Sequence, residues 1–387
     1  MKWKNKGHEF DELSKKILND KVQYYIWGAG TFGRSFCEEF CNEISIVKFI
    51  DRNPVKQGRK VCSYDVISPE EFLESYTFDD AIVLVSTGLT KSVYDVLKKW
   101  GLKRYVNYFH IDEWSSIYMF YKYGKVYVSD ITFGITQYCT LKCEYCNSFI
   151  PKIPSPVNYP LEKLKQEIYR YFQWVDEVNV LGLCGGDAMV YPYFDDLLQW
   201  IIEEFYPARV KHIEIYSNAV IIPTVKQLNM FKENKIVYRF TDYSGSTGKQ
   251  NIPEVLKLLK QYNILYDHVQ FKEWYDCGYP QVSNGIDSEK ELETFFDLCD
   301  RKTCHGIWNG KLFFCAVCFY ADLIDYCKLD YRDVFDLAHF DVEKRMEFIE
   351  YYLGYNERGY LNYCKMCNGG MNINSHSIPV GEQRKKE

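Results

Sequence analysis

The amino-acid sequence predicts an α/β protein with two parallel sheets and a small cysteine-rich region near its C-terminal end. Three observations carry this prediction. Strand-like and helix-like segments alternate before residue 115, a longer alternation begins near Val126, and short irregular segments follow Cys277. Alternation of this kind is typical of βα units with parallel strands. We therefore predict three domains, at residues 1–115, 126–275 and 276–375.

The first domain begins with a strand at Tyr24–Trp27, and its apolar runs predict further strands at 45–51, 80–87 and 105–109. Ser68, Pro69 and Glu71 predict a capped helix start, because Ser can cap, Pro suits the first helical position and Glu completes the capping box. A second helix is predicted at 92–102 from apolar residues at helical spacing.

The second domain contains five predicted strands separated by helical segments, and no internal repeat is visible. The strands are expected at 127–136, 177–183, 212–218, 236–242 and 267–274. Five βα units predict a full or partial α/β barrel, whose chemistry lies at the carboxyl ends of the strands. The polar residues at 376–387 are expected to be frayed.

Composition narrows the class of protein. No apolar run approaches the roughly 18 residues of a membrane span, and the N-terminus lacks the apolar region of a signal peptide, so we predict a cytoplasmic protein without membrane partners. The 47 basic and 53 acidic residues give a net charge of −6, which disfavours nucleic-acid binding by bulk charge. The 15 cysteines are odd in number and clustered, which indicates metal-binding or catalytic thiols rather than disulfides.

A glycine-rich turn follows the first strand. Gly28, Gly30 and Gly33 precede a helical segment, and Asp51 ends the next strand, 18 residues after Gly33. Such glycines let a phosphate approach a helix N-terminus, and the carboxylate is placed to bind ribose hydroxyls. The domain resembles Rossmann-like domains attached to sugar-modifying enzymes. Two interpretations stay open: it binds a nucleotide or nucleotide sugar, or it keeps the glycine turn for structural reasons alone.

A cysteine motif directly follows the strand at 127–136. Cys139, Cys143 and Cys146 are separated by three and two residues, and the next cysteine is Cys184. Cysteine thiolates hold iron–sulfur clusters, so this loop could ligate three irons of a [4Fe–4S] cluster and leave the fourth iron open. A zinc knuckle is the alternative.

With the aromatic Tyr145 before its last cysteine, this motif resembles the CxxxCxxC loop of the radical S-adenosylmethionine (SAM) superfamily. The resemblance covers about residues 126–370. It implies a partial (β/α)6 barrel and SAM bound to the open iron through its amine and carboxylate. It also implies formation of a 5′-deoxyadenosyl radical, with Tyr145 beside the adenine.

A second motif supports the same resemblance. Gly185, Gly186 and Asp187 close the strand at 177–183, where the superfamily has a GGE-like turn that holds the SAM amine. Glycines bring backbone carbonyls close to a ligand and a carboxylate pairs with an ammonium, although Asp reaches less far than Glu. By the same resemblance, four residues at the ends of the next two strands would contact the SAM carboxylate and ribose: Ser217, Asn218, Arg239 and Asp242.

The C-terminal cysteines form a third pattern. Cys299, Gly310 and Cys315 have the spacing that begins SPASM and shorter twitch domains, and Asn309-Gly310 predicts a tight hairpin between them. No cysteine follows Cys367, so the resemblance implies one auxiliary [4Fe–4S] cluster of the twitch type. A zinc ribbon is the alternative. Among six candidate ligands we favour Cys304, Cys315, Cys364 and Cys367, with Cys299 as the main substitute.

These motifs predict an enzyme that abstracts hydrogen from a substrate C–H bond, with a flavodoxin or ferredoxin as one-electron donor. The resemblance implies oxidation if the auxiliary cluster accepts an electron from the substrate radical, or epimerisation if a thiol donates hydrogen to it. The Rossmann-like domain favours a carbohydrate or nucleotide-linked small molecule as the substrate. Cys277 and Cys318 are the spare thiols that could donate hydrogen in an epimerisation. Modification of a ribosomal peptide is the alternative among enzymes, and a non-catalytic iron–sulfur redox protein is the alternative outside them.

Overall fold

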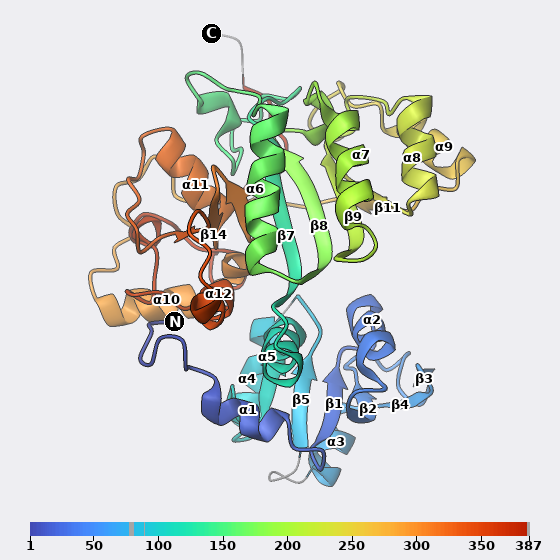
Figure 1. The fold of residues 1–387 in the computed structure, drawn as a ribbon, viewed down its shortest axis with the longest axis vertical. Helices are drawn as coiled ribbons and strands as arrows, with labels where there is room; N and C mark the ends of the chain where they lie inside the picture. The colour runs from blue at the N-terminus through green and yellow to red at the C-terminus, as the bar shows by residue number, and fades with distance from the viewer. Residues whose placement is uncertain (77–80, 89, 385–387) are drawn as a thin grey trace. The chain divides into compact units, whose positions relative to one another are not determined.

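The computed structural model describes residues 1–76, 81–88 and 90–384. The chain forms two compact units, one of His8–Lys125 and one of Met1–Gly7 together with the residues from Val126 onward. Each unit contains its own sheet of mainly parallel strands, with helices beside it (Figure 1). The predicted α/β class is therefore confirmed. Residues 276–375 lie in the same compact unit as residues 126–275.

The unit of His8–Lys125 has a six-stranded sheet in the order β3-β4-β2-β1-β5-β6. All neighbours are parallel except β3 and β4. Because β2 lies on one side of β1 and β5 on the other, the direction of strand order reverses at β1. The strands are β1 Gln23–Trp27, β2 Ser45–Ile50, β3 Lys60–Val61, β4 Tyr64–Ile67, β5 Ala81–Val85 and β6 Tyr108–His110.

Local signals placed most of these elements. The side chain of Ser68 accepts a hydrogen bond from the Glu71 amide at 3.1 Å and caps α3, Pro69–Ser75, as predicted. The residues of β5 are all buried, which explains their continuous apolar run. Asp80, at the start of the predicted strand, lies outside the described residues. The other helices are α1 Asp11–Ile17, α2 Thr31–Phe40, α4 Thr90–Lys99 and α5 Ile111–Tyr123. Of these, α1 and α5 were not predicted.

The second unit has an eight-stranded sheet in the order β11-β10-β9-β8-β7-β13-β14-β15. Its first five strands are parallel and lie in chain order, and α6 and α7 lie over them in Figure 1. These are β7 Tyr127–Thr136, β8 Glu177–Gly185, β9 Val210–Ser217, β10 Val237–Thr241 and β11 Tyr266–Val269. The helices between them are α6 Leu161–Trp174, α7 Phe194–Phe205, α8 Val225–Glu233 and α9 Ile252–Gln261.

The cysteine-rich region extends this sheet beyond β7. Strand β13, Gly306–Trp308, is parallel to β7, and β14, Lys311–Phe313, pairs antiparallel with both β13 and β15, Phe335–Asp336. Asn309 and Gly310 between β13 and β14 have φ values of 52° and 70°, as the predicted tight hairpin requires. The helices of this region are α10 Glu289–Leu298, α11 Ala316–Leu323 and α12 Arg345–Tyr352.

The C-terminal residues are ordered through residue 384, so the expectation of fraying is wrong for them. Strand β16, Ser377–Ile378, pairs with β12, Trp274–Tyr275, and Gln383 forms an isolated antiparallel bridge with Cys143. Residues 385–387 lie outside the described residues. Polar composition was misleading because the polar groups of this segment bond to other segments. No helix in the described part of the chain has both the length and the apolar character needed to cross a membrane.

Candidate functional site

The three cysteines of the predicted loop lie together at the carboxyl end of β7. Burial raises the pKa of the Cys139 thiol to about 12 and that of Cys143 to about 11. The charge of Cys146 raises both values further, and that of Cys143 also raises the pKa of Cys139. The Cys146 amide also donates to the Cys143 carbonyl oxygen at 3.3 Å, so the loop turns back on itself between these two cysteines.

Amide groups donate to two of these sulfurs. Asn218 Nδ2 lies 3.3 Å from Cys139 Sγ, and the backbone amide of Leu141 donates to the same sulfur at 3.4 Å. Gln383 Nε2 donates to Cys143 Sγ at 3.2 Å. Donors of this kind stabilise the thiolate form that iron requires, so the donor set fits an iron–sulfur cluster.

The glycines after β8 are required by the packing of this loop. A Cβ on Gly185 would lie 2.3 Å from the Thr136 carbonyl oxygen, and one on Gly186 would lie 2.2 Å from that of Tyr138. The amide of Asp187 donates to the same Tyr138 oxygen at 3.0 Å. The turn therefore fixes the backbone that leads into the cysteines. The predicted contact of these glycines with SAM stays a prediction.

Asp187 is buried and connects the ends of two strands. Its Oδ1 accepts from the Met189 amide at 2.9 Å, and its Oδ2 accepts from the Asn218 amide at 2.9 Å and from Ser217 Oγ at 3.2 Å. Burial raises the pKa of this carboxyl, and the three hydrogen bonds oppose that rise. Asp187 thus holds the backbone of Asn218, and the side-chain amide of Asn218 donates to Cys139 Sγ. Sequence reasoning placed Asp187 and Asn218 near the site but missed this link.

Arg239 and Asp242 have partners on β9, β11 and the adjoining segments. Arg239 forms ion pairs with Glu214 at 3.6 Å and Asp267 at 3.4 Å. Asp242 Oδ2 lies 2.9 Å from His268 Nε2 and accepts from Gln270 Nε2 at the same distance. The predicted ligand contacts of both residues stay predictions.

Tyr243, the residue after Asp242, was missed by the sequence reasoning. Burial raises the pKa of its hydroxyl, and the charges of all three loop cysteines raise it further. Its side chain therefore lies near the cysteine loop. Its position just after a strand of the parallel sheet was the only signal that could have found it.

A cavity of about 280 Å³ lies beside the cysteine loop and is lined by Tyr145, Cys146 and Cys277, among others. Cys277 Sγ donates to Asn147 Oδ1 at 3.2 Å, and burial raises the pKa of its thiol to about 12. Lys152, another lining residue, is a cation that a polar ligand could use. Cys318, the other predicted thiol, is fully buried within α11 and is not among the lining residues.

Several C-terminal cysteines gather from separate segments. Burial raises the pKa of Cys364, and the charges of Cys299 and Cys315 raise it further. Cys367 is buried and accepts from the Gly369 amide at 3.2 Å, whereas Cys304 is exposed. No group of three His, Cys, Asp or Glu side chains in the described ranges is compact enough to hold a single metal ion. The predicted choice of four ligands stays a prediction.

Arg301 places a cation among these thiols. Burial lowers the pKa of its guanidinium, but the charges of Cys277, Cys315, Cys304 and Cys367 outweigh burial and raise it. Its Nε is buried and has no hydrogen-bond partner among the described residues. A positive group in this position fits an anionic thiolate cluster.

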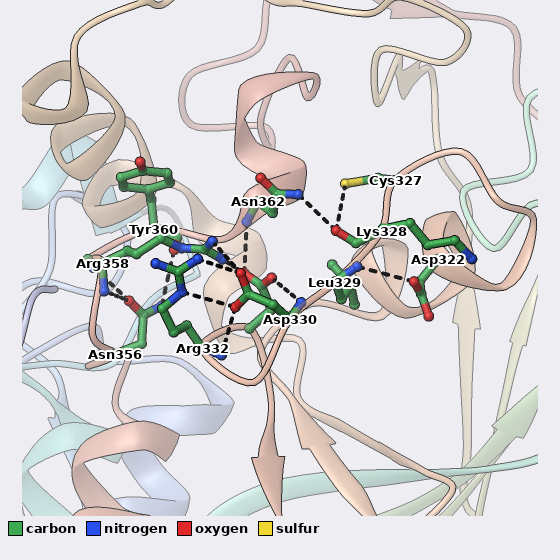
Figure 2. Close-up of polar contacts among 12 residues, drawn as sticks. Asp322, Cys327, Lys328, Leu329, Asp330, Arg332, Asn356, Arg358, Tyr360 and Asn362 are labelled. Carbon is green, nitrogen blue, oxygen red and sulfur yellow. Dashed lines mark hydrogen bonds and ion pairs between the residues drawn. The ribbon is translucent and has the colours of Figure 1, made fainter.

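A network of charged side chains around the fully buried Asp333 holds the segment that carries Cys364. Figure 2 shows Arg358 reaching Asp330, with a distance of 3.1 Å from Nη1 to Oδ2. Arg358 also forms an ion pair with Asp333, which is fully buried and accepts from the Asn362 amide at 2.8 Å. Asn362 begins the short 3-10 helix that contains Cys364. The network therefore fixes the backbone that presents this thiol.

The unit of His8–Lys125 has a separate cavity of about 310 Å³ at the carboxyl ends of β1 and β5. Strand order reverses at this point, where ligands of open α/β sheets bind. A Cβ on Gly28 would lie 2.5 Å from Ser86 Oγ, and one on Gly33 would lie 2.1 Å from the Gly28 carbonyl oxygen. The protein's own packing thus requires both glycines. A Cβ on Gly30 would have Lys56 Nζ as its nearest neighbour, at 3.9 Å, so the protein's own packing does not require this glycine.

Asp51 lines this cavity, but its carboxylate is already engaged. Oδ2 accepts from the Ala29 amide and from Lys56 Nζ, both at 2.9 Å, and Oδ1 accepts from the Asn53 amide at 2.9 Å. Burial raises the pKa of Asp51, but these hydrogen bonds outweigh burial and lower it. Lys56 is therefore bound to the carboxylate that was expected to bind ribose. The predicted ribose contact stays a prediction.

No protein-family model matches the chain, and no curated protein matches it significantly. Among solved structures, anSMEcpe with bound AdoMet and Cp18Cys peptide is 15% identical, with a TM-score of 0.31, covering 37% of this chain and 43% of that chain. The chain thus spans less than half of that protein.

Two further solved structures illustrate the range of similarity. BtrN in complex with AdoMet and 2-DOIA is 15% identical, with a TM-score of 0.42, covering 62% of this chain and 93% of that chain. RSP, a Rex-family repressor, in complex with beta-NADH is 20% identical, with a TM-score of 0.21, covering 24% of this chain and 50% of that chain. At such identities and TM-scores, these structures assign no function to this chain.

Proposed function

We propose that this chain is a radical SAM enzyme whose [4Fe–4S] cluster is held by Cys139, Cys143 and Cys146. One observation carries the proposal: three thiols lie on one loop at the carboxyl end of β7, with side-chain amides donating to two of the sulfurs. The spacing of the motif leaves the fourth iron without a cysteine from this loop, so it is open to SAM.

The chain's own residues would organise the site. When bound, the cluster and SAM supply a 5′-deoxyadenosyl radical that removes a hydrogen atom from a substrate C–H bond. Asn218 and Gln383 orient the ligand sulfurs, and the turn at Gly185–Asp187 fixes the loop. The cavity beside Cys146 would hold the substrate, with Lys152 available to bind a polar group.

We infer that the second cysteine group holds an auxiliary [4Fe–4S] cluster. Cys315, Cys364 and Cys367 would be ligands, and Cys304 or Cys299 would be the fourth. Electrostatic influence of Cys299 on Cys364 supports Cys299, while the backbone bridge between Cys304 and Cys315 supports Cys304. Arg301 would balance part of the negative charge of the cluster.

For the reaction, we propose oxidation or epimerisation of a carbohydrate or nucleotide-linked small molecule. The position of Cys277 on the cavity favours epimerisation, because its raised pKa keeps the thiol protonated. In that case the substrate carbon loses a hydrogen atom to the 5′-deoxyadenosyl radical and gains one from Cys277. The sulfur radical then takes an electron from the external donor and a proton from water.

The assay for this proposal is anaerobic reconstitution with iron and sulfide, reduction, and detection of 5′-deoxyadenosine from SAM. We expect cleavage by the wild-type protein and none by Cys146→Ala. Bound iron without cleavage would support a redox protein, and bound zinc would support the zinc alternative; either result overturns the proposal. Deuterium from heavy water in the product, lost in Cys277→Ala, would identify epimerisation.

We also propose that the cavity at β1 and β5 binds a nucleotide or nucleotide sugar. Gly30 leaves the start of α2 open, and Lys56 and Arg52 line the same cavity, so a phosphate would meet backbone amides and two cations. The carboxylate of Asp51 would then act by holding Lys56 rather than by binding ribose directly.

Thermal-shift measurements on the full chain test this nucleotide site. A nucleotide at 100 times its dissociation constant should add about 2.7 kcal/mol of stability, and Gly30→Val should remove the shift because its side chain blocks the phosphate. Val55→Ala, an exposed change outside the cavity, is the control. If NAD, NADP and the UDP-, GDP- and CMP-sugars all leave the melting temperature unchanged, the unit has only a structural role.

A further inference from the structure

We propose that the C-terminal segment at 380–384 is part of the iron–sulfur site, and that Gln383 is a positioning residue that raises the reduction potential of the cluster. The inference rests on the proposed function, because it requires a cluster on Cys139, Cys143 and Cys146. It goes further by assigning a role in this site to residues that lie outside every motif of the sequence.

The side-chain amide of Gln383 has one orientation that satisfies its neighbours. Its Oε1 accepts from the Lys142 amide at 2.9 Å, which turns Nε2 toward Cys143 Sγ at 3.2 Å. Nε2 also donates to the Gly381 carbonyl oxygen at 2.8 Å. The reversed amide would place Nε2 against the Lys142 donor and Oε1 against an acceptor. The network therefore fixes a donor on the sulfur of Cys143.

Backbone bonds attach the segment to both sides of Cys143. The amide of Glu144 donates to the Glu382 carbonyl oxygen at 2.7 Å, and the amide of Arg384 donates to the Lys142 carbonyl oxygen at 2.8 Å. The Arg384 side chain adds an ion pair with Glu144 at 3.3 Å. Residues 382–384 thus make five polar contacts with residues 142–144.

The segment also passes the residues that follow β10. Gly381 has a φ of 63°, and a Cβ there would lie 2.8 Å from the Tyr243 side chain. Ser246 donates through Oγ to the Val380 carbonyl oxygen. The segment therefore contacts both the residues that follow β10 and the cysteine loop that follows β7. Cys143 is accordingly only 8% exposed.

The hydrogen bond from Gln383 to Cys143 and the low solvent exposure of Cys143 both act on the reduction potential of the cluster. Hydrogen bonds to ligand sulfurs and solvent exposure are among the factors that set the potential of an iron–sulfur cluster. A donor to a thiolate offsets the extra negative charge of the reduced state, so it raises the potential. Gln383 would thus ease the electron transfer on which SAM cleavage depends.

The test is a potentiometric titration of the reconstituted full chain, with electron paramagnetic resonance as the readout. The cluster on the loop is identified as the one whose resonance signal changes when SAM is added. Gln383→Leu removes the donor, and Gln383→Glu keeps the acceptor for Lys142 but replaces the donor with an oxygen. We expect both to lower the potential by about 59 mV, a tenfold shift in a one-electron equilibrium. Gln199→Leu, the same kind of change at an exposed position of α7, should leave it unchanged.

The outcomes separate the two proposals. A wild-type protein without a SAM-responsive cluster contradicts the proposed function. A wild-type protein with that cluster, and Gln383 variants with full iron and an unchanged potential, contradict this inference alone. As a second measurement, a chain ending at residue 379 should lose iron from this cluster in air several-fold faster than the full chain. Equal rates would also contradict the inference.

Discussion

The two cysteine groups of this protein differ in how the chain brings their thiols together. Cys139, Cys143 and Cys146 lie within eight consecutive residues at the end of one strand. The C-terminal group spans 69 residues from Cys299 to Cys367 and draws on segments next to α10 and α11 and on the short helix at 362–365. The first group is local and the second is assembled by tertiary structure.

This difference predicts different vulnerabilities. The loop group depends on close neighbours, namely the turn at Gly185–Asp187 and the amides of Asn218 and Gln383. The C-terminal group depends on whatever holds its separate segments, above all the ion pair of Arg358 with the fully buried Asp333. Changes remote from the thiols should therefore damage the second group more than the first.

The largest expected effect comes from removing the loop thiols. The triple variant of Cys139, Cys143 and Cys146 to Ala should lose all SAM cleavage and keep about half of roughly eight irons per chain. The double variant Cys364→Ala, Cys367→Ala should also lose about half of the iron but retain SAM cleavage. Iron analysis with a 5′-deoxyadenosine assay measures both. A wild-type protein with only about four irons per chain would contradict the proposal of a second cluster.

The next effect concerns the framework of the C-terminal group. Arg358→Met leaves the carboxylate of Asp333 buried without its cation, which should cost about 3–5 kcal/mol of unfolding free energy. Denaturant titration measures this loss, and iron should be lost mainly from the auxiliary cluster. Arg332→Met is the matched control, because Arg332 pairs with Asp330 at the surface. If Arg358→Met has the same unfolding free energy as the wild-type protein, the network does not hold the segment that carries Cys364.

A smaller effect is expected at Asp187. Asp187→Asn turns an NH2 group toward backbone donors, which should cost about 1–3 kcal/mol and loosen Asn218. The resonance signal of the SAM-responsive cluster and the affinity for SAM should both change, while the auxiliary cluster is unaffected. Asp196→Asn, an exposed change in the first turn of α7, is the control. An altered SAM affinity with an unchanged cluster signal would favour a direct contact with the ligand.

The glycine turns show how far sequence reasoning reached. Their positions were correct, since Gly28 and Gly30 lie between β1 and α2, Gly33 lies in the first turn of α2, and Gly185 and Gly186 lie at the end of β8. Their roles were only partly foreseen. Ligand approach was one expected reason for all five, and a structural reason was the alternative for the three in the first domain. Four of the five are explained by contacts with the protein's own atoms, whereas a Cβ on Gly30 would have no close contact.

The sequence by itself determined the features that depend on near neighbours: the bounds of β7, the cap of α3, the hairpin at Asn309-Gly310 and the cysteine loop. Apolar periodicity, capping and turn conformation are short-range effects, so a short window of residues specifies them. Tertiary structure alone decided the partners of Asp51 and Asp187 and the placement of Gln383 on Cys143, 240 residues away in the chain. A hydrogen bond requires two groups within about 3 Å, and no local pattern encodes which distant segment will supply the second group.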